Sequence, residues 1–161
     1  METKFDEAMA RIHFRYVRPP APVRAEDIGA FEREIGYSLP PDYRDFLLKY
    51  GLATGSGDTR FTNADNPDEV ETSVDVFYGL KPGDTYDLRG MRRTFSDRLP
   101  PHLLPVASGS GGEFCLSLAG EDAGRIYWWF QETGKVLSPA DLEPIADSFA
   151  QFVNSLVCVE E

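Results

Sequence analysis

The first third of the chain places its apolar residues at the spacing of amphipathic helices. Four of them recur at i, i+3, i+4 and i+7 and so share one helix face: Phe5, Ala8, Met9 and Ile12. Prolines at positions 19, 20 and 22 end this helix, because proline lacks an N–H and restricts the residue before it. Two further helices are predicted over residues 25–35 and 41–50, each followed by a glycine that favours a helix end.

Beyond residue 51 the period of the pattern changes from that of helices to that of strands. Apolar stretches separated by glycine-rich turns predict strands over residues 60–63, 74–79, 103–107, 113–118 and 125–130. A helical pattern over 85–99 interrupts them, and a last amphipathic pattern that runs through Leu156 predicts a helix beginning near residue 140 or 143. We therefore expect an α+β fold with N-terminal helices, an antiparallel β-meander and a closing C-terminal helix.

The length of 161 residues suits one domain. We expect it to span 1–161, with an N-terminal helix and proline-rich connector over 1–22 and a core over 23–161. The start of the chain mixes charges and lacks the apolar run of a secretory signal, and no stretch reaches the roughly 18 apolar residues of a membrane span. The isolated cysteines, Cys115 and Cys158, are typical of reduced core thiols. These features predict a cytoplasmic protein without membrane contact.

The formal net charge of −11 is unevenly distributed along the chain. Residues 58–75 hold six acidic residues against one arginine, whereas residues 89–98 hold four arginines against one aspartate. An acidic surface repels nucleic acid and anionic lipid and attracts cationic partners. The alternative is that the acidity only maintains solubility.

No group of residues in the sequence suggests catalysis, a cofactor or a metal. His13, His102 and the two cysteines lack the short spacing of zinc ligands. The glycine-rich stretch 108–112 lies between two predicted strands and lacks the Gly-Lys-Ser/Thr ending of a phosphate loop, so we interpret it as a hairpin turn. The acids near 65–71 lack the glycine and the closing glutamate of a calcium loop. We expect no enzyme, although carboxylates that meet only in the fold leave a hydrolase as an alternative.

Residues 28–47 resemble the opening signature of the SUKH superfamily, a Smi/Knr-type family. The matching motifs are a helix with Phe-Glu, a glycine, a Leu-Pro pair and a Tyr-x-x-Phe helix, found here at Phe31-Glu32, Gly36, Leu39-Pro40 and Tyr43 to Phe46. Later segments are also similar to the family, namely the aromatic strand end at 77–80, the proline-led strand and glycine turn over 104–116, and the strand over 124–129. The resemblance covers about residues 28–132 and implies the same α+β fold.

The chain departs from the family pattern at two places. Tyr50-Gly51 stands where the family usually has Asn-Gly-Gly, and Phe130-Gln131 stands where it often has acidic or histidine residues. The resemblance implies a protein-binding role, because many bacterial members are immunity proteins that block a toxin domain. Some eukaryotic members act instead as interaction proteins in cell-wall signalling.

The acidic segment and the aromatic strand supply the candidate contact residues. Side chains alternate across a strand, so Tyr127 and Trp129 share the face opposite to Trp128. One set joins the core, and the other either anchors a partner or is covered by another segment. The candidate partner-binding residues are Asp58, Asp65, Asp68, Glu69, Glu71, Asp75, Tyr127 and Trp129.

The residues and the resemblance together suggest a non-enzymatic protein-binding domain. The first hypothesis is an immunity protein that binds and neutralises a cognate bacterial toxin, for instance a basic nuclease, through an acidic surface. The alternative is a regulatory interaction module of the Smi/Knr type with a non-toxin protein partner. Neither hypothesis involves a cofactor, nucleic acid or a membrane.

Overall fold

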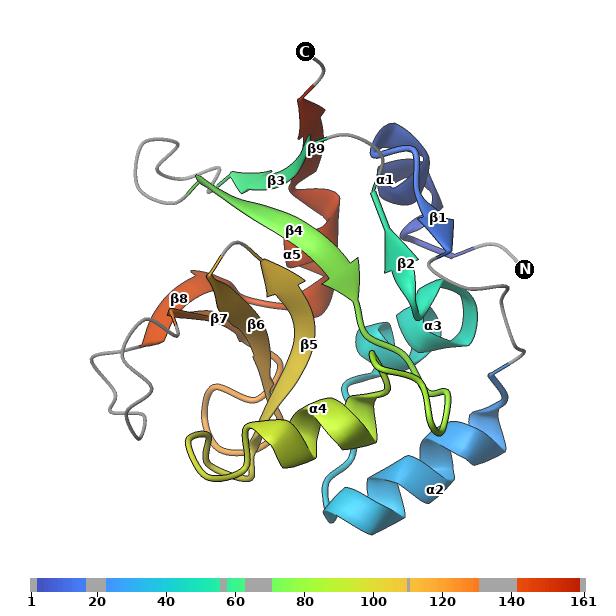
Figure 1. Ribbon diagram of the computed structural model, residues 1–161, viewed down its shortest axis with the longest axis vertical. Helices are drawn as coiled ribbons and strands as arrows, with labels where there is room; N and C mark the ends of the chain where they lie inside the picture. Colours follow the sequence, from blue (N-terminus) through green and yellow to red (C-terminus); the bar gives the residue numbers. More distant parts are fainter. Residues whose placement is uncertain are drawn as a thin grey trace.

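A curled antiparallel sheet forms the centre of the molecule (Figure 1). The computed structural model describes residues 3–16, 23–55, 58–62, 71–109, 111–130 and 142–159, with only the backbone at 58, 62, 71, 72, 130 and 159. The seven strands lie in the order β8-β7-β6-β5-β4-β3-β9, and β1 pairs with β2 in a separate ribbon. The strands are β1 (Arg15–Tyr16), β2 (Ala53–Thr54), β3 (Asp58–Thr62), β4 (Glu71–Phe77), β5 (Leu103–Gly109), β6 (Gly112–Ser117), β7 (Ile126–Phe130), β8 (Leu142–Ala146) and β9 (Leu156–Val159).

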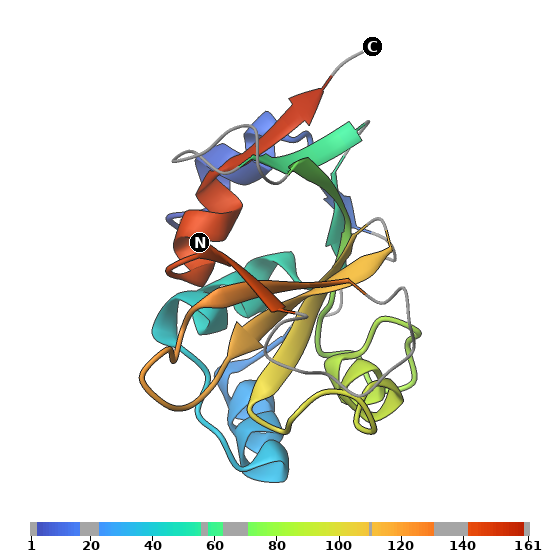
Figure 2. The same cartoon turned by 90° about the vertical axis from the view of Figure 1, so that its left-hand side faces the viewer.

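Helices cover both faces of this sheet. They are α1 (Asp6–Arg11), α2 (Ala25–Ile35), α3 (Pro41–Tyr50), α4 (Leu88–Thr94) and α5 (Phe149–Asn154). Figure 2 shows α3 and α5 on one side of the sheet and α4 on the other. The prediction of an α+β fold is therefore confirmed, and the two helices predicted over 25–35 and 41–50 have the expected bounds.

Irregularities in the strands produce the curl of the sheet. The pairing register shifts in β4 between Val74 and Val76, in β5 between Pro105 and Ala107, and in β8 between Pro144 and Ala146. A β-bulge bends the strand that carries it and increases its twist. Because Pro105 lacks an N–H, a bulge is also one of the few places where a strand inside a sheet tolerates proline.

Aromatic rings fill the space between the curled sheet and the helices α1, α3 and α5. Phe46 of α3 lies 5.3 Å from Phe5, 5.0 Å from Phe77 of β4 and 4.9 Å from Phe149 of α5, measured between ring centroids. Phe114 of β6 lies 4.8 Å from Phe152. Edge-to-face and tilted pairs at these distances stabilise a core beyond their buried area, by about 0.5–1.5 kcal/mol each.

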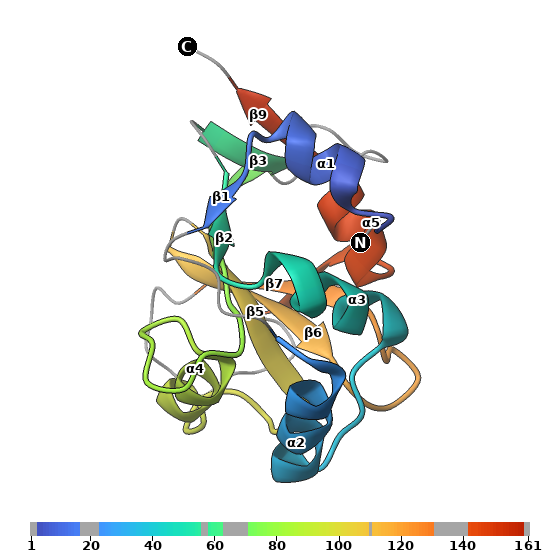
Figure 3. The same cartoon turned by 90° about the vertical axis from the view of Figure 1, so that its right-hand side faces the viewer.

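The N-terminal helix α1 belongs to this same core. The four apolar residues predicted to share its inner face are at most 1% exposed. Arg11 fixes the outer side of the helix, because its guanidinium donates to the carbonyl oxygens of Leu156 and Asn154, each at 2.9 Å. At the other end, the Asp6 carboxylate accepts hydrogen bonds from Tyr50 and Lys49 of α3. The helix is thus tied to both α3 and β9 (Figure 3).

The predicted closing helix is shorter than the sequence pattern suggested, and its start is a correction. Residues 142–146 form the edge strand β8, the helix α5 begins only at Phe149, and residues 156–159 form β9. Pro144 would leave a helical hydrogen bond unmade, whereas an edge strand tolerates it. Ser148 then starts the helix by accepting the N–H of Gln151 at 3.0 Å.

The chain crosses itself closely where α3 leads into β2 and β4 leads toward α4. A Cβ atom on Gly79 would lie 3.0 Å from the carbonyl carbon of Gly51 and from the backbone nitrogen of Leu52. Leu52 itself has φ of 63°, a left-handed conformation that glycine adopts more easily. Leu52 stands where the family's usual Asn-Gly-Gly has its second glycine. The chain thus departs from the family motif at a residue whose backbone is strained.

We expect Gly79→Ala to lower the free energy of unfolding by about 1–3 kcal/mol, because the added methyl group would press on the peptide bond between Gly51 and Leu52 and on the Leu52 side chain. Urea unfolding followed by circular dichroism measures this change. Gly90→Ala in α4 is the matched control: a Cβ there meets nothing within 4 Å, so the stability should stay equal or rise by up to about 1 kcal/mol. Equal stability of the two variants would show that the crossing is not tight.

Candidate functional site

The structure gathers three of the predicted acidic contact positions on two neighbouring strands. Asp58 begins β3, while Glu71 and Asp75 lie in β4. The two strands are hydrogen-bonded to each other, with Thr62 opposite Glu71, at the upper end of the molecule in Figure 1. The remaining acidic candidates, Asp65, Asp68 and Glu69, lie outside the described residues.

Among the acidic candidates, Asp75 is the residue whose side chain the structure describes. It is exposed, and its neighbours Val74 and Val76 lie at the bulge of β4. The hydroxyl of Thr54 in β2 donates to the Asp75 carbonyl oxygen at 2.5 Å. The backbone that presents this carboxylate is therefore held from both sides, by β5 and by the short ribbon.

Glu113 of β6 is a buried acid that the sequence analysis did not select. It is 3% exposed, and its carboxylate accepts a hydrogen bond from the hydroxyl of Tyr78. Burial raises the pKa of Glu113 to about 7; the hydrogen bond from Tyr78 opposes this shift, and the charge of Asp75 adds to it. The signal in the sequence was a charged residue inside an otherwise apolar strand that follows a glycine turn.

A carboxyl group with a raised pKa suits proton transfer when it lines a cleft. Glu113 lies opposite Ser108 on one neighbouring strand and Trp129 on the other, and it is almost completely covered. Its side chain is therefore shielded from solvent between these strands, within reach of the charge of Asp75.

The aromatic strand β7 separates its side chains between two clusters, as alternation predicts. Trp128 joins the main core, whereas Trp129 packs with Phe95, Leu99 and Cys115 on the opposite face. Phe95 meets the Trp129 ring edge-on at 5.5 Å, and the Arg98 guanidinium lies 5.4 Å from the ring centroid. Trp129 is only 3% exposed, which leaves it little surface with which to contact a partner.

Tyr127 keeps a partly exposed ring on the same face of β7. Its hydroxyl donates to the Asp122 carboxylate at 2.7 Å. This hydrogen bond lowers the pKa of Asp122 and holds the phenol at the surface. The two predicted aromatic contacts thus differ: Tyr127 is partly exposed, whereas Trp129 is buried in the cluster against which Tyr127 packs.

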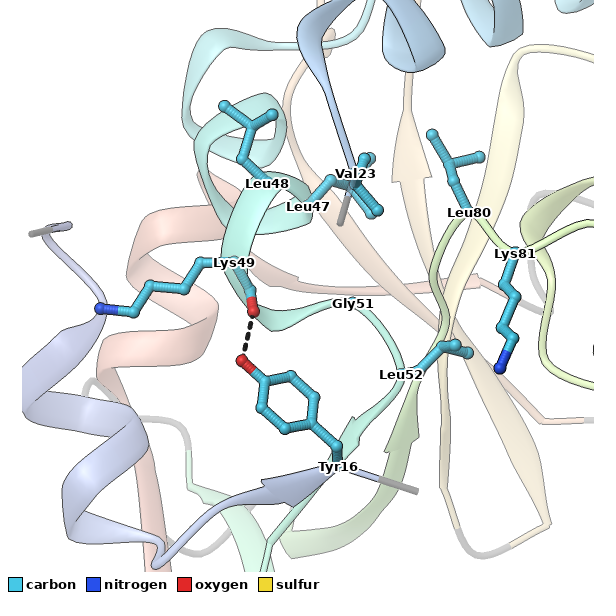
Figure 4. Close-up of a pocket in the computed structure, with 9 residues that line it drawn as sticks. All are labelled: Tyr16, Val23, Leu47, Leu48, Lys49, Gly51, Leu52, Leu80 and Lys81. Carbon is cyan, nitrogen blue, oxygen red and sulfur yellow. Dashed lines mark hydrogen bonds between the residues drawn. The ribbon is translucent and has the colours of Figure 1, made fainter. Parts of the chain in front are cut away.

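A small cavity lies where the chain crosses itself, between β1, α3 and β2 (Figure 4). Apolar side chains of Val23, Leu47 and Leu80 line it, and the hydroxyl of Tyr16 closes one side by donating to the Lys49 carbonyl oxygen at 2.7 Å. Its volume of about 30 Å³ has room for about one or two water molecules. This space is far smaller than the roughly 300 Å³ at which ligand pockets begin.

A larger and more open groove runs between the end of α2 and the helix α4. Its volume is about 280 Å³, and it is lined by Glu34, Ile35, Arg89, Arg92, Arg93 and Ser96. The arginines belong to the stretch of reversed charge that the sequence showed, and their spacing of i, i+3 and i+4 puts them on one side of α4. The groove lies at the end of the molecule away from β3 (Figures 1 and 3).

The described residues include neither a cluster of metal-ligating side chains nor a membrane-spanning helix. No three side chains of His, Cys, Asp or Glu lie together as a group that could hold a metal ion. In the same part of the chain, no helix combines the length and the apolar character needed to cross a bilayer.

A curled antiparallel sheet with helices on both faces, an acidic end and a basic groove describe an α+β binding domain. The chain belongs to the SMI1/KNR4 family (SUKH-1), whose family model matches residues 22–155. The family resemblance noted in the sequence is therefore confirmed, and with it a protein-interaction domain of the immunity or Smi/Knr type.

The chain is also similar to a protein of Bacillus subtilis (strain 168) described as the SPbeta prophage-derived uncharacterized protein YokK. The two are 31% identical over 176 residues, which cover 96% of this chain and 85% of that protein. The similarity thus extends over α1, which lies before the first residue of the family match.

The burial of Glu113 predicts a specific pH dependence of stability. The folded pKa of about 7 lies above the ordinary value of 4.5, so the stability that the neutral carboxyl supports is complete below pH 4.5 and is lost as the pH rises to about 7. Across this window the free energy of unfolding of the wild-type protein should fall by on the order of 3 kcal/mol. We expect Glu113→Gln, which keeps an acceptor for Tyr78, to remove this fall. Urea unfolding at several pH values between 4.5 and 8 measures the difference.

Glu143→Gln provides the control, because Glu143 is an exposed acid on β8 and its replacement should leave the pH profile of the wild-type protein intact. Asp6 does not interfere with this measurement. The hydrogen bond from Tyr50 lowers the pKa of Asp6, so its contribution to stability changes only at pH values below its ordinary pKa of 3.8. Identical pH profiles for E113Q and the wild-type protein would contradict the assignment.

Proposed function

We propose that this protein is an immunity protein, a non-enzymatic domain that binds a cognate bacterial toxin and neutralises it. The observation that carries the proposal is membership of the SMI1/KNR4 family (SUKH-1) over residues 22–155. The excess of acidic residues then indicates the chemistry of the partner, because a net charge of −11 favours a basic protein. A nuclease is such a partner, since its cleft must attract the phosphates of nucleic acid.

The proposed toxin-binding surface is the acidic end of the sheet, where Asp58 lies on β3 and Glu71 and Asp75 lie on β4. Asp65, Asp68 and Glu69 belong to the same proposed contact set by sequence, because residues 58–75 hold six acidic residues against Arg60; these three lie outside the described residues. Asp75 supports the proposal structurally, because its exposed carboxylate stands on a strand that is paired on both sides. Carboxylates that occupy the cleft of a nuclease would take the positions of phosphates and exclude the substrate.

Tyr127 belongs to the proposed contact set as a partly exposed aromatic residue, whereas Trp129 enters it only as the support behind that face. We also propose that residues 1–161 act as one unit, because α1 shares the main core with the later elements. The protein would work in the cytoplasm, where a nuclease toxin meets its substrate.

The test is association of the purified protein with the toxin candidate encoded beside its gene. Reversal of Asp65, Asp68 and Glu69 to lysine should slow association by roughly tenfold or more at low salt, since long-range attraction acts mainly on the association rate. Raising the ionic strength to about 0.5 M should shrink the difference between the variant and the wild-type protein. Surface plasmon resonance at several salt concentrations measures both effects.

A matched variant separates the surface from the total charge. Reversal of three exposed acids elsewhere, Asp97, Glu121 and Glu143, changes the net charge by the same amount and should slow association far less. Equal slowing by both triple variants would mean that the acidic end has no special role. A lack of any complex with the neighbouring gene product would favour the regulatory interaction module with a different protein partner.

A further inference from the structure

The groove between α2 and α4 is a concentration of positive charge on an acidic protein. Three arginines line it, against the single carboxylate of Glu34. They do not contribute equally, because one of them forms ion pairs with described residues and the other two do not.

Arg89 is the engaged arginine and joins the two helices. Its Nε donates to the Glu34 carboxylate at 2.7 Å, its NH1 lies 3.8 Å from Asp87, and its guanidinium stands 5.5 Å from the ring centroid of Phe31. The contact with Glu34 shows directly that this groove accommodates a carboxylate against a guanidinium. Arg89 thereby fixes the wall along which the other two arginines lie.

Arg92 and Arg93 are the arginines of the groove that could bind an anionic group. Neither guanidinium forms an ion pair with another residue that the structure describes. The Nε of Arg92 is buried and has no hydrogen-bond partner among those residues. A buried donor without an acceptor costs free energy, and a turn of the Arg92 side chain toward a carboxylate in the groove would recover it.

We propose that this groove binds carboxylate groups presented by an acidic segment of the protein partner. Guanidinium groups match the planar, two-oxygen geometry of a carboxylate, and a groove of about 280 Å³ has room for one or two acidic side chains rather than a long polymer. Nucleic acid fits less well, because its continuous negative charge would meet a protein of net charge −11.

The inference rests on the proposed function and deepens it by adding a second contact for the same partner. The acidic strands and this groove lie at opposite ends of the long axis of the molecule in all three views (Figures 1, 2 and 3). A partner that carries a basic surface and an acidic segment would therefore meet complementary charge at both ends and in one orientation only.

The experiment uses the full chain and a fluorescein-labelled hexaglutamate peptide, so it does not depend on the identity of the toxin. Fluorescence anisotropy at low salt should show binding to the wild-type protein, weakened roughly tenfold or more in Arg92→Gln/Arg93→Gln. The control is Lys4→Gln/Arg15→Gln, which removes the same charge from exposed residues near α1 and β1 and should change the affinity less than about twofold.

Arg93→Gln alone guards against a folding defect, because Arg93 is exposed and its side chain makes no hydrogen bond with the described residues; it should weaken binding several-fold. The proposal fails if the wild-type protein does not bind the peptide or if both double variants weaken binding equally. It also fails if inorganic phosphate or single-stranded RNA of the same charge binds more tightly than hexaglutamate. None of these results depends on whether a toxin complex forms.

Discussion

The packing of Phe46 connects parts of the molecule that are far apart in the sequence. Its ring touches α1 through Phe5, β4 through Phe77 and α5 through Phe149, all within 5.3 Å between centroids. Helix α3 thus places this ring where the N-terminal segment, the sheet and α5 converge. The acidic strand β4 and the crossing of the chain at Gly51 and Gly79 are both positioned by this arrangement.

Because both faces of the sheet are covered, the described surface has few apolar sites for a partner. Trp129, the largest aromatic candidate, lies under Phe95 and Arg98 instead of at the surface. Val157 on the edge strand β9 is the large hydrophobic residue that the described part of the chain leaves exposed, at 39%. Recognition by this part of the protein must therefore depend on charge and hydrogen bonding more than on apolar burial.

The sequence pattern predicted the elements whose periodicity is unambiguous. The helices over 25–35 and 41–50 have strong apolar faces and clear ends, so local residues determine them. The C-terminal pattern was ambiguous, since Ile145 and Phe149 fit a helical face but are also buried when Ile145 lies in a strand. Pairing with β7 decided between the two possibilities, and such long-range pairing leaves no local signal.

The candidate site was predictable to a similar extent. Local charge marked both the acidic segment and the arginine stretch, but only the fold shows that Arg89 is paired to Glu34 from another helix, whereas Arg92 forms no ion pair with the residues that the structure describes. The raised pKa of Glu113 likewise depends on burial between strands that are distant in sequence. The charge of a segment follows from its sequence, whereas the burial of an ionisable group and the formation of its ion pairs depend on tertiary contacts.

This difference determines what each end of the molecule can contribute to binding. Exposed carboxylates such as Asp75 attract a basic partner from a distance, yet an exposed ion pair adds only about 0–1 kcal/mol to the complex that forms. A half-buried guanidinium such as Arg92 gains more from a carboxylate, because the pair forms where water is partly excluded. The acidic end therefore governs how fast a partner arrives, and the arginine groove is the part of the described surface better suited to hold it.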